Sequence, residues 1–350
     1  MFREFFYAMS PAAAWAAFAG CLVLILYTGT RLSRYADLIA VRTGLGGVWV
    51  GLVLLAVVTS APELITGLSA ILVVGEPDLA VGSALGSCIY NLIIIAILDF
   101  IYRPGSIYTG IRHSHSLSAG FGVILLGTVA GVIFVEHNFA ILPLGPIGVY
   151  TLIAPVIYVL AMRSVFFFER RLDGVGELTS AEAKARAAHR GLTEVYLRFG
   201  LNALGLIAAA TVLPVIGEAL ARIMGWHETF VGTIFLAFAT SVPEIVISVQ
   251  AVRIGAVDLA IGGIFGSNLF DLLIIAVEDV AYLPGSVLAA TSEQHLLTAV
   301  AALTMTGIAI VGLCSRPQPK VFRVMGWASL GLFVVGLFSA LVLYLLGING

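Results

Sequence analysis

The sequence predicts an all-α integral membrane protein with ten transmembrane helices, arranged as two inverted repeats of five helices each. Three observations support this prediction. Long apolar segments recur along the chain, the basic residues gather on one predicted side of the membrane, and two segments of the first half return in the second. Of 350 residues, 60% are hydrophobic and 11% are charged, with a mean hydropathy of +1.07. This composition is too apolar for the core of a soluble domain.

The predicted spans are apolar windows long enough to cross roughly 30 Å of hydrocarbon as a helix. They lie near residues 12–31, 47–74, 79–101, 115–135, 139–161, 195–221, 229–253, 259–282, 295–314 and 324–347. A signal peptide is the alternative for the first span, but we expect a retained helix because no small-residue cleavage site follows it. Cys21, Cys88 and Cys314 all fall inside apolar spans, and their spacing predicts neither disulfides nor a metal site.

The Lys and Arg residues orient the predicted spans. With the N-terminus outside, all 18 basic residues except Arg3 and Arg222 lie on the inner side. One span more or fewer would scatter them over both sides. We therefore expect both termini outside a plasma or inner membrane, with a polar cytoplasmic linker at residues 163–194 between a first repeat, 1–162, and a second, 195–350.

Two segments of the first half return in the second. VGLVLLAVVTSAPE at 50–63 matches VGTIFLAFATSVPE at 231–244, and DLAVGSALGSCIYNLIIIAILD at 78–99 matches DLAIGGIFGSNLFDLLIIAVED at 258–279. The repeated units cover about 47–101 and about 228–282. Because five spans is an odd number, the second copy enters the membrane from the opposite side. Inverted repeats of this kind are typical of secondary transporters, whose substrate site lies near the membrane midplane.

Each copy carries hydroxyls and a carboxylate on one helical face. Thr59 and Ser60 precede Glu63 by four and three residues, so the three side chains share a face of the second span. The seventh span repeats the pattern with Thr240, Ser241 and Glu244. A carboxylate in the hydrocarbon costs a few kcal/mol, so intramembrane acids normally face a polar interior and mark ion paths.

A proline precedes each of these glutamates. Pro62 and Pro243 lack the amide hydrogen that would bond to the carbonyls of Val58 and Ala239 in a regular helix. Freed carbonyls are useful cation ligands. Proline kinks also occur for packing alone, but the neighbouring glutamates favour a functional role.

The third and eighth spans complete an all-oxygen set. Ser87 lies four residues before Asn91, and Ser267 and Asp271 occupy the matching places in the second copy. The four central residues are Glu63, Asn91, Glu244 and Asp271. Three carboxylates and an amide suit a hard cation, and calcium in particular, which accepts six to eight oxygens in flexible geometry. The surrounding hydroxyls and freed carbonyls suit sodium, so the two ions would compete for one chamber.

These motifs resemble a known family. Two copies of T-S-x-P-E, each followed by G-S-x-x-x-[ND], resemble the α-repeats of the sodium/calcium exchanger family, part of the calcium/cation antiporter superfamily. The resemblance implies antiport of Ca²⁺ against Na⁺, with the four central residues binding Ca²⁺ or Na⁺. It implies flanking Na⁺ sites at Thr59, Ser60, Ser87, Thr240, Ser241 and Ser267, with Ala56 and Ala237 offering carbonyls. It also implies that the first and sixth spans slide against the other eight.

The sequence departs from the family pattern beside the ligands. Val58 and Ala239 precede T-S, and the glycine-rich patterns read Gly82-Ser83 with Gly86-Ser87-Cys88 in one copy and Gly262-Gly263 in the other. These changes leave the four central residues intact, so they bear on ion selectivity rather than on transport. Gly82-x-x-x-Gly86 and Gly262-x-x-x-Gly266 are interpreted as sites of close helix packing.

Three alternatives are weighed against sodium-coupled exchange. Protons could replace sodium, because close carboxylates repel one another and favour protonation. A passive cation channel would use the same oxygens without alternating access. An enzyme would have to use His113 and His115, which form no H-E-x-x-H pattern and are expected to be solvated at the interface, like Asp99, Asp279 and Glu218. We expect no enzyme activity, no organic cofactor and no nucleic acid; the expected partners are inorganic cations and the bilayer.

Overall fold

A computed structural model describes residues 9–139, 147–172, 191–224, 237–316, 320–321 and 324–349, without the side chains of 218, 221–222, 237–240, 343–344 and 346–349. These residues are almost entirely helical, and the described part contains no strand beyond a single bridge between Val321 and Met325. Eight described helices are long and apolar enough to cross a membrane, and α12 and α16 bring the described helical segments to ten. The predicted fold class is confirmed.

The described helices make up ten long segments and two short helices, η3 and α14, that lie between them. The second long segment is interrupted. The helices are α2 (Pro11–Thr43), α3 (Gly46–Val50), η1 (Gly51–Leu55), α4 (Ala56–Thr59), α5 (Ala61–Ser69), η2 (Ala70–Val74), α6 (Pro77–Ile101), η3 (Ile107–Thr109), α7 (Ser114–Asn138), α8 (Val149–Leu172), α10 (Leu192–Met224), α12 (Ala237–Arg253), α13 (Val257–Ala281), α14 (Val287–Ala290), α15 (Gln294–Ser315) and α16 (Trp327–Asn349). The pieces from α3 to η2 form one span, Gly46–Val74.

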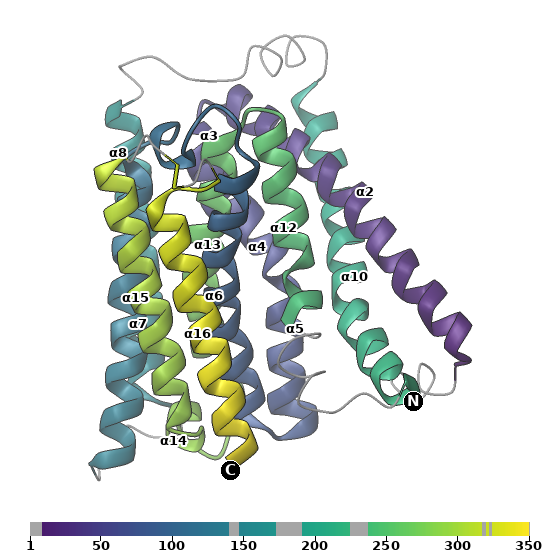
Figure 1. The fold of residues 1–350 in the computed structure, drawn as a ribbon, viewed down its shortest axis with the longest axis vertical. Helices are drawn as coiled ribbons and strands as arrows, with labels where there is room; N and C mark the ends of the chain where they lie inside the picture. Colours follow the sequence, from purple (N-terminus) through teal and green to yellow (C-terminus); the bar gives the residue numbers. More distant parts are fainter. Residues whose placement is uncertain are drawn as a thin grey trace.

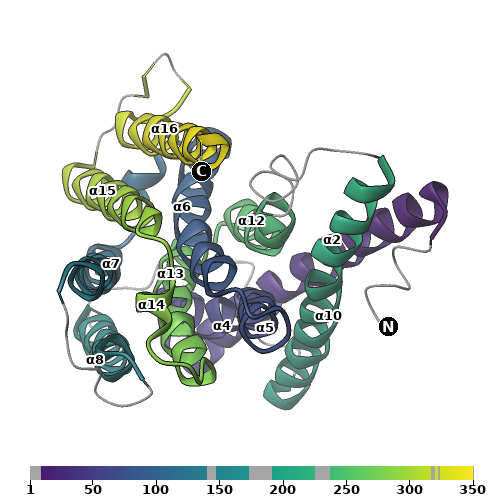
Figure 2. The same ribbon diagram turned by 90° about the horizontal axis from the view of Figure 1, so that it is seen from below.

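The helices form three groups in space. The long helices α2 and α10 pack against each other at one side, and both are tilted relative to the others (Figures 1 and 2). Helices α6 and α13 cross at the centre, next to the broken second span and α12. Helices α7, α8, α15 and α16 stand on the other side of this centre. The four elements that carry the repeated motifs, namely the second span, α6, α12 and α13, therefore lie in the middle of the molecule.

The predicted boundaries of the fifth span and of the linker are wrong. The span was expected at residues 139–161, but α8 covers Val149–Leu172 and so runs past the predicted start of the linker at residue 163. At its other end the linker was expected to reach residue 194, but α10 already begins at Leu192. The central part of the linker, 173–190, lies outside the described residues.

Aromatic stacking explains why basic residues do not end α8. The guanidinium carbon of Arg163 lies 4.9 Å from the ring centroid of Phe167, and that of Arg170 lies 4.6 Å from the centroid of Phe166. Long basic side chains can rest their charged group on aromatic rings while their stems cover apolar surface. The first arginine of the segment is therefore a poor marker of the end of the helix.

Small residues of the second copy bring α13 against the backbone of the second span. A Cβ added to Gly262 would lie 2.6 Å from the carbonyl oxygen of Val48, and one added to Gly266 would lie 2.4 Å from that of Leu52. Only glycine leaves room for such an approach, so the packing role predicted for this pair is confirmed. The first copy differs: Gly82 faces the ring of His295, and a Cβ on Gly86 would meet no described atom within 4 Å.

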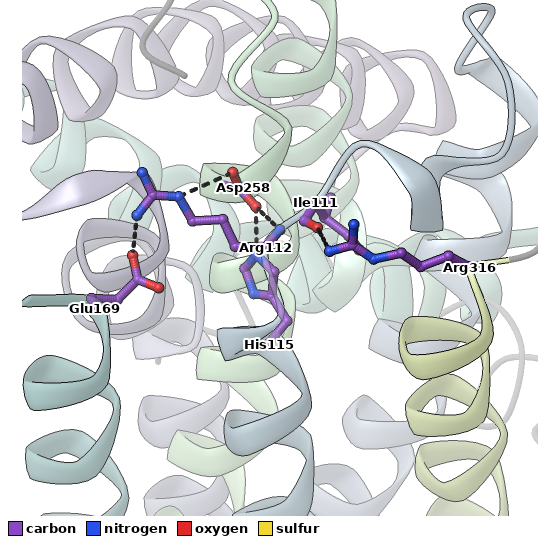
Figure 3. A network of polar contacts seen from close by, with 6 residues as sticks. All are labelled: Ile111, Arg112, His115, Glu169, Asp258 and Arg316. Atoms are coloured by element: carbon purple, nitrogen blue, oxygen red, sulfur yellow. Dashed lines mark hydrogen bonds and ion pairs between the residues drawn. The ribbon is translucent and has the colours of Figure 1, made fainter. Parts of the chain in front are cut away.

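A partly buried ionic network links the start of α13 to the start of α7. Asp258 Oδ1 accepts the backbone N–H of Arg112 at 2.8 Å and lies 2.9 Å from His115 Nε2 (Figure 3). The Arg112 guanidinium also bonds to Glu169 of α8 at 2.7 Å. His115 is fully buried, so its expected solvation is wrong, whereas His113 is exposed as expected.

Asp99 and Asp279 are also not solvated, contrary to expectation. Both are buried, at 0% and 2% exposure, and each binds backbone N–H groups of two separate loops. Asp99 accepts the N–H groups of Ile107 and Gly326 at 2.7 and 2.6 Å. Asp279 accepts those of Val287 and Gly148 at 2.6 and 2.7 Å. Each aspartate therefore joins the loop after its own helix to the start of a distant helix, α16 for Asp99 and α8 for Asp279. The side chain of Glu218 lies outside the described residues.

Candidate cation site

The second span breaks at the residues that the repeat predicts. Helix α4 ends at Thr59, Ser60 adopts φ −88° and ψ 4°, and α5 begins with Pro62 in its first turn. Because proline has no N–H, the Val58 carbonyl has no amide donor four residues later. π-helical turns, η1 and η2, flank this break on both sides. Such wide turns are frequent at functional sites, where they displace the backbone from the regular helical path.

The seventh span carries the matching proline inside a helix. Pro243 lies within α12, and it likewise removes the donor for the carbonyl of Ala239. The backbone of this helix is described from Ala237 onwards. The side chains of Ala237 and Thr240, two of the predicted flanking residues, lie outside the described residues.

All four central side chains are buried. Glu63 is 3% exposed, Asn91 2%, Glu244 4% and Asp271 0%. The carboxylate of Glu63 lies within electrostatic range of both Glu244 and Asp271, and that of Glu244 within range of Asp271. The structure therefore brings together residues from α5, α6, α12 and α13 that are up to 208 positions apart in sequence.

Equivalent residues of the two copies touch each other where α6 crosses α13. Asn91 Nδ2 donates to Asp271 Oδ2 at 3.2 Å. Asn268 Nδ2 donates to the carbonyl of Cys88 at 3.4 Å, and Cys88 Sγ lies 3.8 Å from the carbonyl of Asn268. Both pairs are separated by 180 residues, which is the offset between the two copies in this segment. Helices α6 and α13 therefore contact each other through equivalent positions of the two copies.

The flanking hydroxyls lie in the same buried region. Thr59 Oγ1 lies 3.0 Å from Ser267 Oγ and also donates to the carbonyl of Leu55 at 3.1 Å. Ser60, Ser87, Ser241 and Ser267 are all buried as well. The carbonyl of Ala56, a predicted ligand, accepts Ser60 N at 2.9 Å and lies 3.3 Å from Thr59 Oγ1. Because the Thr59 hydroxyl has one hydrogen and the Leu55 carbonyl is the nearer acceptor, the firm donor to the Ala56 carbonyl is Ser60 N, and a lone pair remains for a cation.

Several oxygens of the site have no hydrogen-bond donor among the described residues. They are Ser60 Oγ, Glu63 Oε2, Glu244 Oε2 and Asp271 Oδ1. Buried polar atoms are nearly always paired, and an unpaired buried carboxylate oxygen is costly. Of these residues, Glu244 lines a cavity of about 10 Å³ together with Thr59 and Ser267; a volume of that order accommodates about one water molecule. The site thus offers oxygen lone pairs and little room.

The carboxylates do not form a closed cage in this conformation. Among the described residues, no three His, Cys, Asp or Glu side chains lie close enough together to hold a metal ion as they stand. A cation here would need hydroxyl, amide or carbonyl oxygens as well, or a small inward movement of the acids. Calcium tolerates such mixed and flexible oxygen coordination.

Sequence reasoning missed several residues of this region. Ser248 lies one turn after Glu244 on the same face of α12, is buried, and lines the cavity. Its spacing of four residues from the glutamate was the available signal. Cys88 was noted as a departure from the family pattern and Asn268 was not singled out, although the two residues form a contact between the copies. Glu278, a further buried acid in α13, was not singled out at all.

Comparison with known proteins identifies related sequences. Residues 13–167 and 195–342 match the family model described as sodium/calcium exchanger protein. The chain is 27% identical over 319 residues to "Inner membrane protein YrbG" of Escherichia coli (strain K12), covering 90% of this chain and 93% of that protein. It is 27% identical over 283 residues to "Putative antiporter CaxA" of Alkalimonas amylolytica, covering 80% of this chain and 84% of that protein.

Solved structures share the fold. The sodium-calcium exchanger NCX_Mj, in crystals soaked with Na⁺ and Sr²⁺, superposes with a TM-score of 0.71 at 15% sequence identity. The match covers 94% of this chain and 98% of that one. At this identity the likeness concerns the fold alone, and it extends over nearly the whole of both chains.

Proposed function

The chain belongs to the sodium/calcium exchanger protein family, and from this premise we propose that it exchanges Na⁺ for Ca²⁺ by alternating access. It is a multi-pass membrane protein of a cation antiporter family and not an enzyme. The identity of the coupling ion, the site residues and the mechanism form our proposal. The proposed Ca²⁺ ligands are the four central residues, with Na⁺ bound at the flanking hydroxyls.

One observation supports the proposal: three buried carboxylates from both copies lie within electrostatic range of one another, and each has an oxygen without a donor among the described residues. Like charges held together in a membrane interior need a compensating cation. A divalent ion neutralises two of the charges at once, and two or more sodium ions can do the same. Ca²⁺ and Na⁺ therefore compete for the same three carboxylates. This competition couples the release of one ion to the binding of the other.

Movement of α2 and α10 is the proposed means of alternating access. These helices pack mainly on each other and touch the central group through α12, α5 and the start of the second span. Ser33 of α2 donates to the carbonyl of Ile247 at 2.9 Å, three residues after Glu244. Gly29 of α2 also approaches the side chain of Val246. A displacement of α2 would therefore act directly on the helix that carries Glu244.

The membrane orientation is also a proposal. The loops after α6, α12 and α15 lie at one end of the helices (Figure 1). At this end Arg112 binds Glu169, and Arg316 and Lys320 bind backbone carbonyls. By the positive-inside rule this end faces the cytoplasm. Both termini and the α14 end then face outward from an inner or plasma membrane.

The decisive experiment is calcium-45 uptake into proteoliposomes under an outward sodium gradient, an outward proton gradient, or no gradient. We expect accumulation only with the sodium gradient, and its loss when a sodium ionophore collapses that gradient. Accumulation driven by the proton gradient alone would reject sodium coupling in favour of proton-coupled antiport. Equilibration without any gradient would reject antiport and indicate a channel.

A further inference from the structure

Glu278 is a buried acid in α13 that the central site does not use. It is 1% exposed, and its Oε2 has no hydrogen-bond donor among the described residues. It lies seven residues after Asp271 on the same helical face, which places it about 10.5 Å further along the axis at 1.5 Å per residue. The intervening turn carries Ile274 and Ile275, both buried. Glu278 is therefore separated from the central carboxylates by an apolar turn.

The side chain of Glu278 is directed at α5, towards the glycine one turn beyond Glu63. A Cβ added to Gly67 would lie 1.8 Å from Glu278 Oε1 and 3.0 Å from its Cδ. The carboxylate therefore occupies the space that any side chain at position 67 would fill. Gly67 lies four residues after Glu63 on α5, and Glu278 lies seven residues after Asp271 on α13. The two helices thus present a second acidic position beside the first.

The other half of the molecule has no such acid. The position equivalent to Glu278 is Leu98 in α6, and the position equivalent to Gly67 is Ser248 in α12. Leu98 is fully buried, so the repeated fold accepts an apolar side chain at this place. Packing alone does not require a glutamate, and a buried, partly unpaired carboxylate in a membrane protein is costly unless it binds something.

We propose that Glu278 is an additional cation-binding residue, which holds Ca²⁺ or Na⁺ between the central site and the α14 end of the helices. Its carboxylate takes a cation, still partly hydrated, that is moving to or from Asp271 and Glu63. Since the other half carries Leu98 instead, this intermediate position exists on one side of the central site only. The inference rests on the proposed cation exchange and adds an asymmetry to it.

The expected consequence is a difference between the two membrane faces. A carboxylate on one path raises the local cation concentration there. Its removal by Glu278→Gln should raise the Ca²⁺ concentration for half-maximal uptake from the α14 face by about threefold or more. Half-saturation from the opposite face should stay unchanged, because Ca²⁺ arriving from there reaches the central carboxylates first.

The test is initial calcium-45 uptake by right-side-out and by inverted membrane vesicles, with the full-length chain. Labelling of Cys314 with a membrane-impermeant maleimide, in a Cys21→Ala background, identifies the face, because Cys314 is exposed at the end opposite α14. Two further variants control for folding. The double variant Gly67→Ser with Glu278→Leu copies the pair of the other half and should behave as Glu278→Gln. Glu136→Gln removes an acid at the same end, bonded to Ser286 Oγ at 2.7 Å, and should have no effect on half-saturation.

Each outcome is decisive. An increase confined to the α14 face in both Glu278 variants supports the inference. Unchanged half-saturation at both faces in variants that still exchange would overturn it and leave the proposed function standing. Complete loss of exchange in both folded variants would place Glu278 in the central site and also reject the inference. Absence of sodium-driven uptake by the unmodified protein would instead reject the proposed function, and the inference with it.

Discussion

The two halves of the molecule fasten equivalent helices in the same way but in different surroundings. In one half, Asp258 binds Arg112 N and His115 Nε2; in the other, Asp78 Oδ1 binds Ser292 N at 2.6 Å and His295 Nε2 at 2.9 Å. The Asp258 side chain is 18% exposed and that of Asp78 is 50% exposed.

We call each of these aspartate-centred contacts a clasp; among the described residues, only the Asp258 clasp includes additional charges. Arg112 lies beside Asp258 and joins Glu169, whereas the Asp78 clasp includes a serine backbone at the matching position. The geometry of the clasp is thus a property of the repeated sequence, D-L-A in both copies. The ionic addition belongs to one end of the molecule, the end where the basic residues gather. The repeated sequence sets the contacts that both copies share. Residues that differ between the copies, such as Arg112, can give the two membrane faces of a transporter different properties.

The largest expected effect tests whether the halves are equivalent at the central site. Glu63→Gln and Glu244→Gln remove equivalent carboxylates with little change in volume. Because even outer-sphere partners of metal ligands are worth roughly 10–100-fold in affinity, loss of a direct ligand should lower exchange by about 100-fold or more. Calcium-45 exchange in proteoliposomes measures this, with size-exclusion profiles to check folding. Near-normal exchange by either folded variant would remove that residue from the site.

A swap of Asn91 and Asp271 sharpens the comparison. These residues occupy equivalent positions and touch at 3.2 Å, so the variant Asn91→Asp with Asp271→Asn keeps both the charge and the hydrogen bond. We expect the single variant Asp271→Asn to be inactive and the double variant to recover roughly a tenth of normal exchange or more, because neighbouring sites that share a function are not additive. A double variant as inactive as the single one would show that the location of the charge, and not only its presence, matters.

Much of this architecture could be read from the sequence. The apolar windows and the basic residues predicted the ten-helix fold, and the repeated T-S-x-P-E motif predicted a proline distortion beside a buried Glu63, because intramembrane acids and prolines leave strong local signals. What could not be read depends on tertiary contact. Asp99 looked like an interfacial residue, and its partners Ile107 and Gly326 lie on separate loops. Glu278 carries no motif of its own, and only its contact with Gly67 of α5 distinguishes it.

The loop-closing aspartates provide a prediction of intermediate size. Asp99→Asn and Asp279→Asn each place an amide NH₂ or a weaker acceptor against two backbone N–H groups. Leaving one buried donor unsatisfied costs about 1–3 kcal/mol, so both variants should show a lower midpoint of thermal unfolding in detergent, by similar amounts. A marked shift in one and none in the other would break the equivalence of the two halves at these loops.

A similar comparison applies to the clasp with the ionic addition. Asp258→Asn removes the carboxylate that binds the buried His115 and the backbone N–H of Arg112, whereas the Arg112 guanidinium keeps Glu169 at 2.7 Å. Breaking a buried pair by removing one partner costs about 3–5 kcal/mol, and we take the lower end or less because the Asp258 side chain is 18% exposed. The thermal midpoint should fall clearly. The separate single variant Glu169→Gln should lower the midpoint less, since Asp258 would keep its bonds to the Arg112 backbone and to His115. An unchanged midpoint in Asp258→Asn would mean that the network adds no stability.

The smallest effect is expected at Asp78, the equivalent residue of the other half. Its side chain is half exposed and its partners are a backbone N–H and a histidine that water can reach. Exposed ion pairs contribute about 0–1 kcal/mol, so Asp78→Asn should barely change the thermal midpoint measured under the same conditions. A loss as large as that of Asp258→Asn would show that the shared clasp carries the stability and that Arg112 and Glu169 are incidental. A small loss would assign the difference to those two residues, and so to the end of the molecule where the positive charges gather.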